Sequence, residues 1–167
     1  MFDLAGQLAA RKDAALYRSR LTSSSPQGVR VAIDGREYLS FCSNDYLGLA
    51  SHPDLICAMT DCAQDWGVGA GASHLLGGHS GPHEELEQVL AEFMGAERVL
   101  LFSTGYMANL AVLTSLVGRG DVIHQDRLNH ASLIDGALLS RASLLRYRHV
   151  DMEALETQLA EDKGNRK

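Results

Sequence analysis

Two short runs of residues in this sequence combine side chains that could hold a phosphate and an aromatic ring. His130 follows an expected strand and precedes an expected helix, and a second junction of this kind contains Ser103, Thr104, Gly105 and Tyr106. In a parallel α/β sheet, ligands bind beyond the carboxyl ends of the strands, where helix N-termini offer unpaired N–H groups and a positive dipole end to anions. One junction suits a phosphate and the other an aromatic contact, which together indicate a cofactor that carries both groups.

Each junction also has a simpler interpretation. Ser103 and Thr104 offer hydroxyls to phosphate oxygens, and Gly105 permits a close approach of the backbone. Ser and Thr are, however, also the preferred N-caps of ordinary helices. Tyr106 can stack on a ring or cover the core, and His130 can be a capping residue. The spacing alone leaves these alternatives open.

The other glycine-rich and histidine-rich segments give weaker indications. Residues 67–71 read Gly-Val-Gly-Ala-Gly, but they follow an expected helix and lack the remaining features of a dinucleotide site or a P-loop. We expect a loop there. His79 and His83 are separated by the start of a helix at Pro82, and no Cys or carboxylate is expected to complete a tetrahedral set, so the sequence predicts no metal site. His124 lies inside an expected strand and is interpreted as structural.

Alternating strands and helices are expected to position the two junctions. Strands are predicted at 99–102, 121–125 and 143–148, and helices from 105 to a stop at Gly118, at 131–140 and from an N-cap at Asp151 to about 160. This alternation predicts a mostly parallel sheet with right-handed crossovers. Three strands make a small sheet for this architecture, so more sheet is expected to follow.

The first half of the sequence predicts helices and one hairpin. Helices are expected at 3–20, from an N-cap at Ser51 to Trp66, and from Gly81 to a stop at Gly95. The hairpin spans 29–42, with Asp34-Gly35 as its turn, and residues 43–49 form a loop.

The composition predicts a globular protein of the cytoplasm. The 167 residues are 46% hydrophobic and 22% charged, and the net charge of −6 argues against a nucleic-acid partner. No apolar run approaches the roughly 18 residues that a membrane span needs, and no signal core is present. Residues 1–30 are basic and serine-rich, as in a transit peptide, although an amphipathic helix is preferred. Three cysteines, Cys42, Cys57 and Cys62, are expected to be reduced.

Four motifs resemble, in order, those of the α-oxoamine synthases, which are fold-type-I enzymes that use pyridoxal 5′-phosphate (PLP). These motifs are residues 41–49, the glycine stretch ending at 71–74, 103–109 and 126–132, and the resemblance extends over roughly 16–151. It implies an α/β fold in which an N-terminal helix and hairpin precede a mostly parallel sheet with helices on both faces. Residues 1–50 would form an N-terminal arm and small-domain segment, and 51–167 the first part of the PLP-binding domain.

The resemblance also implies roles for particular residues. His130 would stack on the pyridine ring and meet substrate, while the residues around the phosphate would be Ser103, Thr104, Gly105 and Tyr106. Substrate would be bound by Arg18, for which Arg20 is an alternative, and by Asn44 and Tyr46 at the entrance, partly across the interface of a homodimer.

The activity implied is a decarboxylative condensation of an amino acid with an acyl thioester, in which the cofactor is the electron sink. The short N-terminal arm and residues 126–128 are most similar to members that condense L-alanine with a pimeloyl thioester, carried by CoA or by acyl carrier protein. Members that make 2-amino-3-oxobutyrate, 5-aminolevulinate or sphingoid bases are alternatives, as is a non-catalytic partner subunit. Lys12, Lys163 and Lys167 are the only lysines, and none lies in the family's Schiff-base motif. The chain is therefore expected to be less than half of an enzyme and inactive alone.

Overall fold

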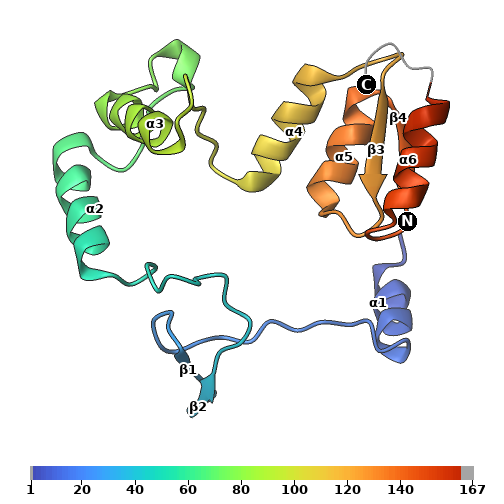
Figure 1. Cartoon of the computed structure of the whole chain (residues 1–167). Helices are drawn as coiled ribbons and strands as arrows, with labels where there is room; N and C mark the ends of the chain where they lie inside the picture. Colours follow the sequence, from blue (N-terminus) through green and yellow to red (C-terminus); the bar gives the residue numbers. More distant parts are fainter. Residues whose placement is uncertain (1, 163–167) are drawn as a thin grey trace. The chain divides into compact units, whose positions relative to one another are not determined.

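The structure is a computed structural model that describes residues 2–162, and the chain divides into two compact units, residues 1–70 and 71–167. The first unit contains α1 (Leu4–Asp13), the antiparallel strands β1 (Arg30–Ile33) and β2 (Arg36–Leu39), and α2 (Pro53–Trp66) (Figure 1). Lys163 and Lys167 lie outside the described residues.

The N-terminal helix is shorter than the predicted 3–20. Ala15 has a φ of 54°, and the amides of Ala15 and Leu16 donate to the carbonyls of Lys12 and Arg11. This pair of bonds is a Schellman motif, which ends a helix with a left-handed residue. Such a residue is usually glycine, so the alanine gave no signal in the sequence. Arg18 consequently lies in irregular backbone beyond α1.

The hairpin is confirmed, whereas the predicted cap of the next helix is wrong. Asp34 and Gly35 have φ values of 50° and 72°, as a two-residue type I′ turn requires. The α2 helix is capped by His52, whose Nδ1 accepts from the Asp54 amide at 3.2 Å. Ser51 lies one residue before the cap, and its hydroxyl donates to the carbonyl of Gln27.

The second unit contains the strand–helix alternation. A 3₁₀ turn (His74–Leu76) and α3 (Gly81–Met94) are followed by α4 (Gly105–Leu116), β3 (Val122–Asp126), α5 (Ala131–Ser140), β4 (Ser143–Tyr147) and α6 (Met152–Glu161). Strands β3 and β4 are parallel, with Val122 opposite Ser143 and Asp126 opposite Tyr147. Figure 1 shows α5 and α6 on opposite sides of this strand pair. The predicted helices on both faces of a parallel sheet are therefore present.

The predicted strand at 99–102 is not formed. These residues have no regular structure, and the sheet has two parallel strands in place of the expected three. Within residues 2–162 no strand pairs with this segment, and Leu100 is 77% exposed. An apolar run becomes a strand only when a neighbour satisfies its backbone N–H and C=O groups, which this part of the chain does not supply.

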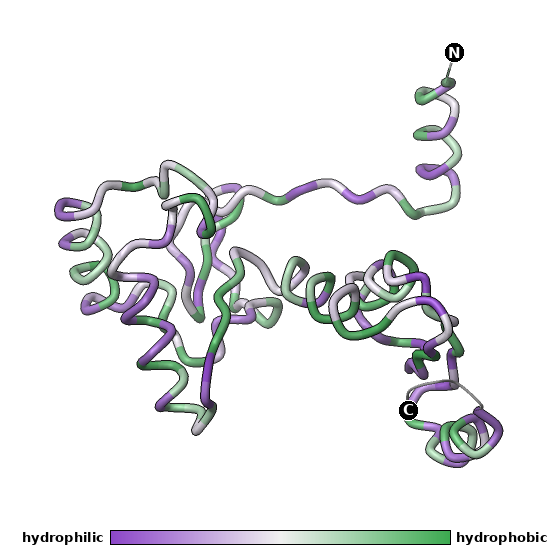
Figure 2. The backbone as a smooth tube through the Cα atoms, turned by 90° about the horizontal axis from the view of Figure 1, so that it is seen from above, coloured by the Kyte–Doolittle hydropathy of each residue, from purple (hydrophilic) through white to green (hydrophobic). Residues whose placement is uncertain are grey.

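Close packing in the second unit occurs between α4 and α5. Gly136 allows it, because a Cβ there would lie 2.9 Å from Leu113 Cδ1 and 3.3 Å from the carbonyl oxygen of Asn109. Ala137 is the one buried apolar side chain in the described part of the chain. Leu138 and Leu139 on the same helix stay exposed, and Figure 2 shows hydrophobic segments recurring along the tube. No helix in residues 2–162 is long and apolar enough to cross a membrane.

Candidate cofactor site

The turn between β3 and α5 is held by one carboxylate. Asp126 Oδ1 accepts from the amide of Leu128 at 2.7 Å, and Oδ2 accepts from the amide of Val150 at 3.0 Å and from His149 Nδ1 at 2.9 Å. These bonds, with the Leu128 amide as the largest cause and the Val150 amide next, hold the pKa of Asp126 below its usual value. Asp126 therefore fixes the backbone that carries His130.

We expect this carboxylate to make the second unit sensitive to acid. Because the pKa of Asp126 is lowered on folding, its stabilisation is present above the ordinary value of 3.8 and is lost as the pH falls through the folded-state value. Asp126→Asn should lower the free energy of unfolding at pH 7, and the difference from the parent should narrow below pH 3.8. Denaturant unfolding followed by circular dichroism from pH 7 to 3 measures this difference. A difference that stays constant over that range would contradict the role of the ionised form.

His130 lies at the predicted strand-to-helix junction and is itself the N-cap of α5. Its Nδ1 accepts from the amide of Ser132 at 3.2 Å and lies 2.7 Å from Ser132 Oγ. The imidazole is exposed, and no hydrogen bond within residues 2–162 uses Nε2. The capping alternative is therefore realised, yet the cap uses only Nδ1. One ring nitrogen and a ring face stay available to a ligand.

The other junction has the features of an anion site. Thr104 is the N-cap of α4, and its Oγ1 accepts from the amide of Met107 at 3.2 Å. The amides of Gly105 and Tyr106 make no hydrogen bond in the described part of the chain, and a Cβ built on Gly105 would meet no atom within 4 Å. Free N–H groups at the positive end of a helix, with open space before them, fit a phosphate group. Ser103 is exposed beside them.

The Tyr106 side chain joins the two junction helices. Its hydroxyl donates to Asp135 Oδ2 on α5, and this hydrogen bond raises the pKa of Tyr106. Since the hydroxyl is already used, a contribution of Tyr106 to phosphate binding would come from its backbone amide.

A second link between α4 and α5 was not foreseen from the sequence. Asn109 Nδ2 donates to Ser132 Oγ at 2.8 Å, and Ser132 is fully buried. Asn109 lies one helical turn beyond Tyr106, and Ser132 two residues beyond His130. The nearness of both residues to the junctions in the sequence was the only sign of this contact. The contact itself depends on how closely the two helices pack.

The proposed substrate residues lie in the first unit. Arg18 lines a hollow formed by residues 17–23, while Asn44 and Tyr46 are exposed in a loop, with the Tyr46 hydroxyl 3.5 Å from Asn44 Oδ1. Their relation to His130 in the second unit stays a prediction.

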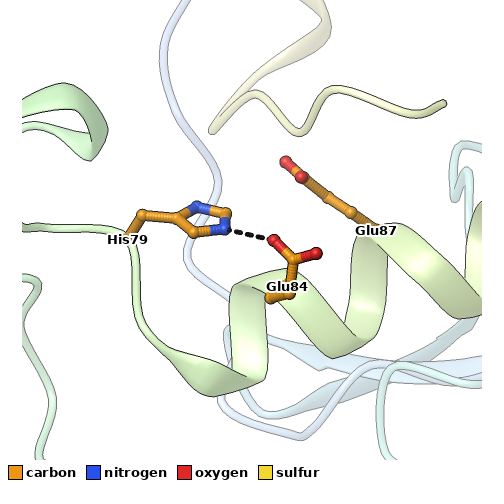
Figure 3. A group of neighbouring side chains, drawn as sticks. All are labelled: His79, Glu84 and Glu87. Atoms are coloured by element: carbon orange, nitrogen blue, oxygen red, sulfur yellow. Dashed lines mark hydrogen bonds and ion pairs between the residues drawn. The ribbon is translucent and has the colours of Figure 1, made fainter.

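Two carboxylates lie close to His79, an arrangement that the sequence did not reveal. His79 Nε2 lies 3.0 Å from Glu84 Oε2, and ligand atoms of His79, Glu84 and Glu87 all lie within 4.8 Å of one another (Figure 3). This happens because the first turns of α3 bring both glutamates beside the preceding loop. The hydrogen bond from His79 is the main reason why the pKa of Glu84 is lowered. His83 instead accepts from the Ser80 amide at the start of α3.

His124 is structural, as predicted. Its side chain is 9% exposed, Nδ1 lies 3.1 Å from Gln158 Oε1, and Nε2 lies 3.1 Å from Asp162 Oδ2. Both ring nitrogens are thus used to join β3 to the C-terminal end of α6.

Curated relatives match nearly the whole chain. The 8-amino-7-oxononanoate synthase of Pseudomonas paraeruginosa is 59% identical over 164 residues, which are 98% of this chain and 41% of the relative. That of Nitrosomonas eutropha is 62% identical over 157 residues, 94% of this chain and 41% of the relative. The chain therefore spans about two fifths of the length of these relatives.

Solved structures share the fold. Serine palmitoyltransferase from Sphingomonas wittichii matches with a TM-score of 0.89 and 31% identity, over 99% of this chain and 44% of that one. The enzyme from S. paucimobilis with bound PLP–myriocin aldimine gives 0.86 and 28%, over 98% and 43%. An 8-amino-7-oxononanoate synthase from Francisella tularensis gives 0.61 and 34%, over 70% and 32%.

These neighbours show the α/β fold of fold-type-I PLP transferases. The model of one family, described as aminotransferase class I and II, matches residues 36–167. Since that match covers both junctions and most of the sequence, the chain belongs to the aminotransferase class I and II family.

Proposed function

We propose that this chain supplies part of the active site of a PLP-dependent 8-amino-7-oxononanoate synthase of biotin biosynthesis. The reaction joins the Cα of L-alanine to the acyl carbon of a pimeloyl thioester, carried by CoA or by acyl carrier protein, and releases the thiol and carbon dioxide. The observation that carries this proposal is identity of 59% and 62% to two synthases over at least 94% of the chain. The two linked junctions support it because they fit the phosphate and ring of one cofactor.

The residues of the second unit would bind and orient the cofactor. The amides of Gly105 and Tyr106 would hold the phosphate at the N-terminus of α4, with the hydroxyls of Ser103 and Thr104 beside them. His130 would lie against the pyridine ring and keep it oriented, with Nε2 available to substrate. When bound, PLP supplies an electron sink for the charge that develops at the alanine Cα.

Residues of the first unit would complete the site. Arg18 would bind a substrate carboxylate through its guanidinium, which suits such groups in a bidentate manner, and Asn44 and Tyr46 would line the entrance in a homodimer. In this proposal residues 1–50 belong to the small domain and 51–167 to the first part of the large domain. We place the enzyme in the cytoplasm.

A sphingoid-base synthase is the second candidate, favoured by the TM-score of 0.89 to a serine palmitoyltransferase. Identity of 31% to that structure, compared with 59% to an 8-amino-7-oxononanoate synthase, makes it the weaker one.

Thiol release separates the two candidates. The protein, at the full length that its gene encodes, should be given PLP and assayed with L-alanine and pimeloyl-CoA or pimeloyl carrier protein, then with L-serine and palmitoyl-CoA. We expect turnover with the first pair and at least about 10²-fold lower kcat/KM with the second, since a palmitoyl chain carries many methylenes beyond the length of a pimeloyl chain, and each methylene that does not fit the pocket is worth about 1–3 kcal/mol. Turnover with the second pair alone would overturn the proposal, and binding without turnover of any pair would favour a non-catalytic subunit.

A further inference from the structure

We propose that Asn109 and Ser132 are positioning residues that hold the His130 ring in one orientation and one tautomer, with the proton on Nε2. The hydrogen bonds themselves do not depend on the proposed function, but the consequence for turnover rests on it. Three residues carry the inference: Asn109 on α4 through its side-chain amide, Ser132 on α5 through its hydroxyl and backbone amide, and His130 through Nδ1.

The direction of the hydrogen bonds follows from what each atom can do. A backbone N–H only donates, so the Ser132 amide, at 3.2 Å, requires Nδ1 of His130 to be an acceptor. The side-chain nitrogen of Asn109 also only donates, so Ser132 Oγ accepts from it at 2.8 Å and turns its own proton toward Nδ1, 2.7 Å away. Nδ1 thus faces two donors, and the proton of a neutral imidazole lies on Nε2.

Burial makes this arrangement specific. Ser132 has no exposed surface, so no water replaces either partner of its hydroxyl. Asn109 reaches Ser132 because α4 and α5 approach closely at Gly136, where a side chain would touch Leu113 and the Asn109 carbonyl. The position of α4, whose N-terminus would hold the phosphate, is in this way coupled to the ring of His130. One hydrogen-bonded chain would align both contacts of the cofactor.

An ordinary helix cap would need less than this. The cap requires only the Ser132 amide and Nδ1, and His52 caps α2 in the same way, with Nδ1 accepting from the Asp54 amide at 3.2 Å. At His130, unlike at His52, the buried hydroxyl of Ser132 and the side-chain amide of Asn109 on a second helix extend the cap. If Asn109 and Ser132 had only a structural role, substituting them would change the stability of the protein but not the tautomer of His130.

The substitution Asn109→Asp tests the direction of these hydrogen bonds, because it replaces a donor by an acceptor with almost no change in side-chain shape. A carboxylate only accepts, so the Ser132 hydroxyl would turn its proton away from His130 and present a lone pair to Nδ1. Nδ1 would then face one donor, the Ser132 amide, and one lone pair, so we expect a substantial fraction of His130 to carry its proton on Nδ1, as seen by long-range ¹H–¹⁵N spectra of protein labelled at histidine. In the parent, Nδ1 should be unprotonated. Ser132→Ala should give a smaller fraction with the proton on Nδ1, because one of the two donors to Nδ1 is lost and the amide donor remains.

The matched control is Ser140→Ala, which removes another buried hydroxyl from α5. Ser140 Oγ donates to the carbonyl of Ala137 and does not touch His130, so the His130 spectrum should not change. Circular dichroism should show that all three variants are folded. If His130 keeps its proton on Nε2 in both Asn109→Asp and Ser132→Ala, the proposal is overturned.

The spectra are recorded on the protein at its full gene-encoded length, without cofactor. Their outcome does not depend on synthase activity, so this proposal and the proposed function can fail separately. With PLP, L-alanine and pimeloyl-CoA, Asn109→Asp should lower kcat at least about tenfold while KM for the acyl donor changes little, since a misaligned ring affects positioning. A tautomer that responds in a protein without synthase activity would support the positioning role and contradict the proposed function. A normal kcat in a variant whose tautomer has changed would show that the ring orientation does not matter to turnover.

Discussion

His130→Ala should slow turnover by about 10²-fold or more at the full gene-encoded length, because loss of a group that orients the reacting centre costs about this much. In free-energy terms this is about 2.7 kcal/mol of transition-state stabilisation, at 1.36 kcal/mol for each factor of ten. The imidazole is exposed at the β3–α5 junction with Nε2 unused within residues 2–162. Removing the imidazole should therefore affect the orientation of a bound ligand more than the stability of the fold.

The capping role of His130 has to be separated from this effect. Loss of an N-cap side chain costs about 0.5–2 kcal/mol of stability, so His130→Ala should also unfold at a lower denaturant concentration. His130→Asn restores a good cap and still removes the ring; its kcat should stay as low as that of His130→Ala while its stability recovers.

His52→Ala is the matched control. His52 caps α2 with the same Nδ1 geometry as His130, at 3.2 Å from an amide two residues on. We expect a comparable loss of stability and unchanged kcat. Steady-state rates of thiol release at saturating L-alanine give the comparison. Equal kcat for the parent and His130→Asn would sink the assignment of the ring.

The sequence predicted the elements whose signals are local. Helix α5 was predicted with its observed bounds, and the Asp34-Gly35 turn and the Asp151 cap of α6 were recognised from their side chains. Each of these depends on a few neighbouring residues, such as the Asp151 carboxylate that accepts from the Ala154 amide at 3.0 Å. Features that depend on a few neighbouring side chains can therefore be predicted from the sequence.

The wrong predictions concern features that depend on distant or unusual contacts. Residues 99–102 have the composition of a strand, but no described strand lies beside them. The end of α1 depends on a left-handed alanine, and the start of α2 depends on His52, whose side chain is an uncommon helix cap. In each case a contact or a backbone conformation outweighed the local preference.

The same distinction applies to the candidate site. The caps of α4 and α5 could be predicted because a hydroxyl or a histidine directly before a helix is a local pattern. The bond from Asn109 to Ser132 could not, since it spans 23 positions and requires Gly136 at the helix contact. The carboxylates beside His79 were missed for a related reason: the fold of the loop before α3 decides which histidine meets Glu84.

Gly105→Val should weaken PLP binding at least tenfold, which corresponds to about 1.4 kcal/mol. The chain itself has room for the new side chain, because a Cβ at Gly105 meets no atom within 4 Å and the residue is not in the left-handed region. Its two methyl groups would instead occupy the space before the free amides of Gly105 and Tyr106, where the phosphate would lie. A loss of PLP affinity would therefore arise from a clash with the bound phosphate and not from a damaged fold.

Gly118→Val is the matched control just beyond the other end of α4. A Cβ there would make only an ordinary contact, 3.9 Å from the carbonyl oxygen of Ser140, so the same substitution should leave PLP affinity unchanged. Dissociation constants come from absorbance titrations with PLP at the full gene-encoded length, with circular dichroism to show that both variants are folded. Because the N–H donors and the dipole end of α4 act over short distances, a bulky group at Gly105 cannot be tolerated if the phosphate binds there. A Gly105→Val protein that binds PLP as tightly as the parent would place the phosphate elsewhere.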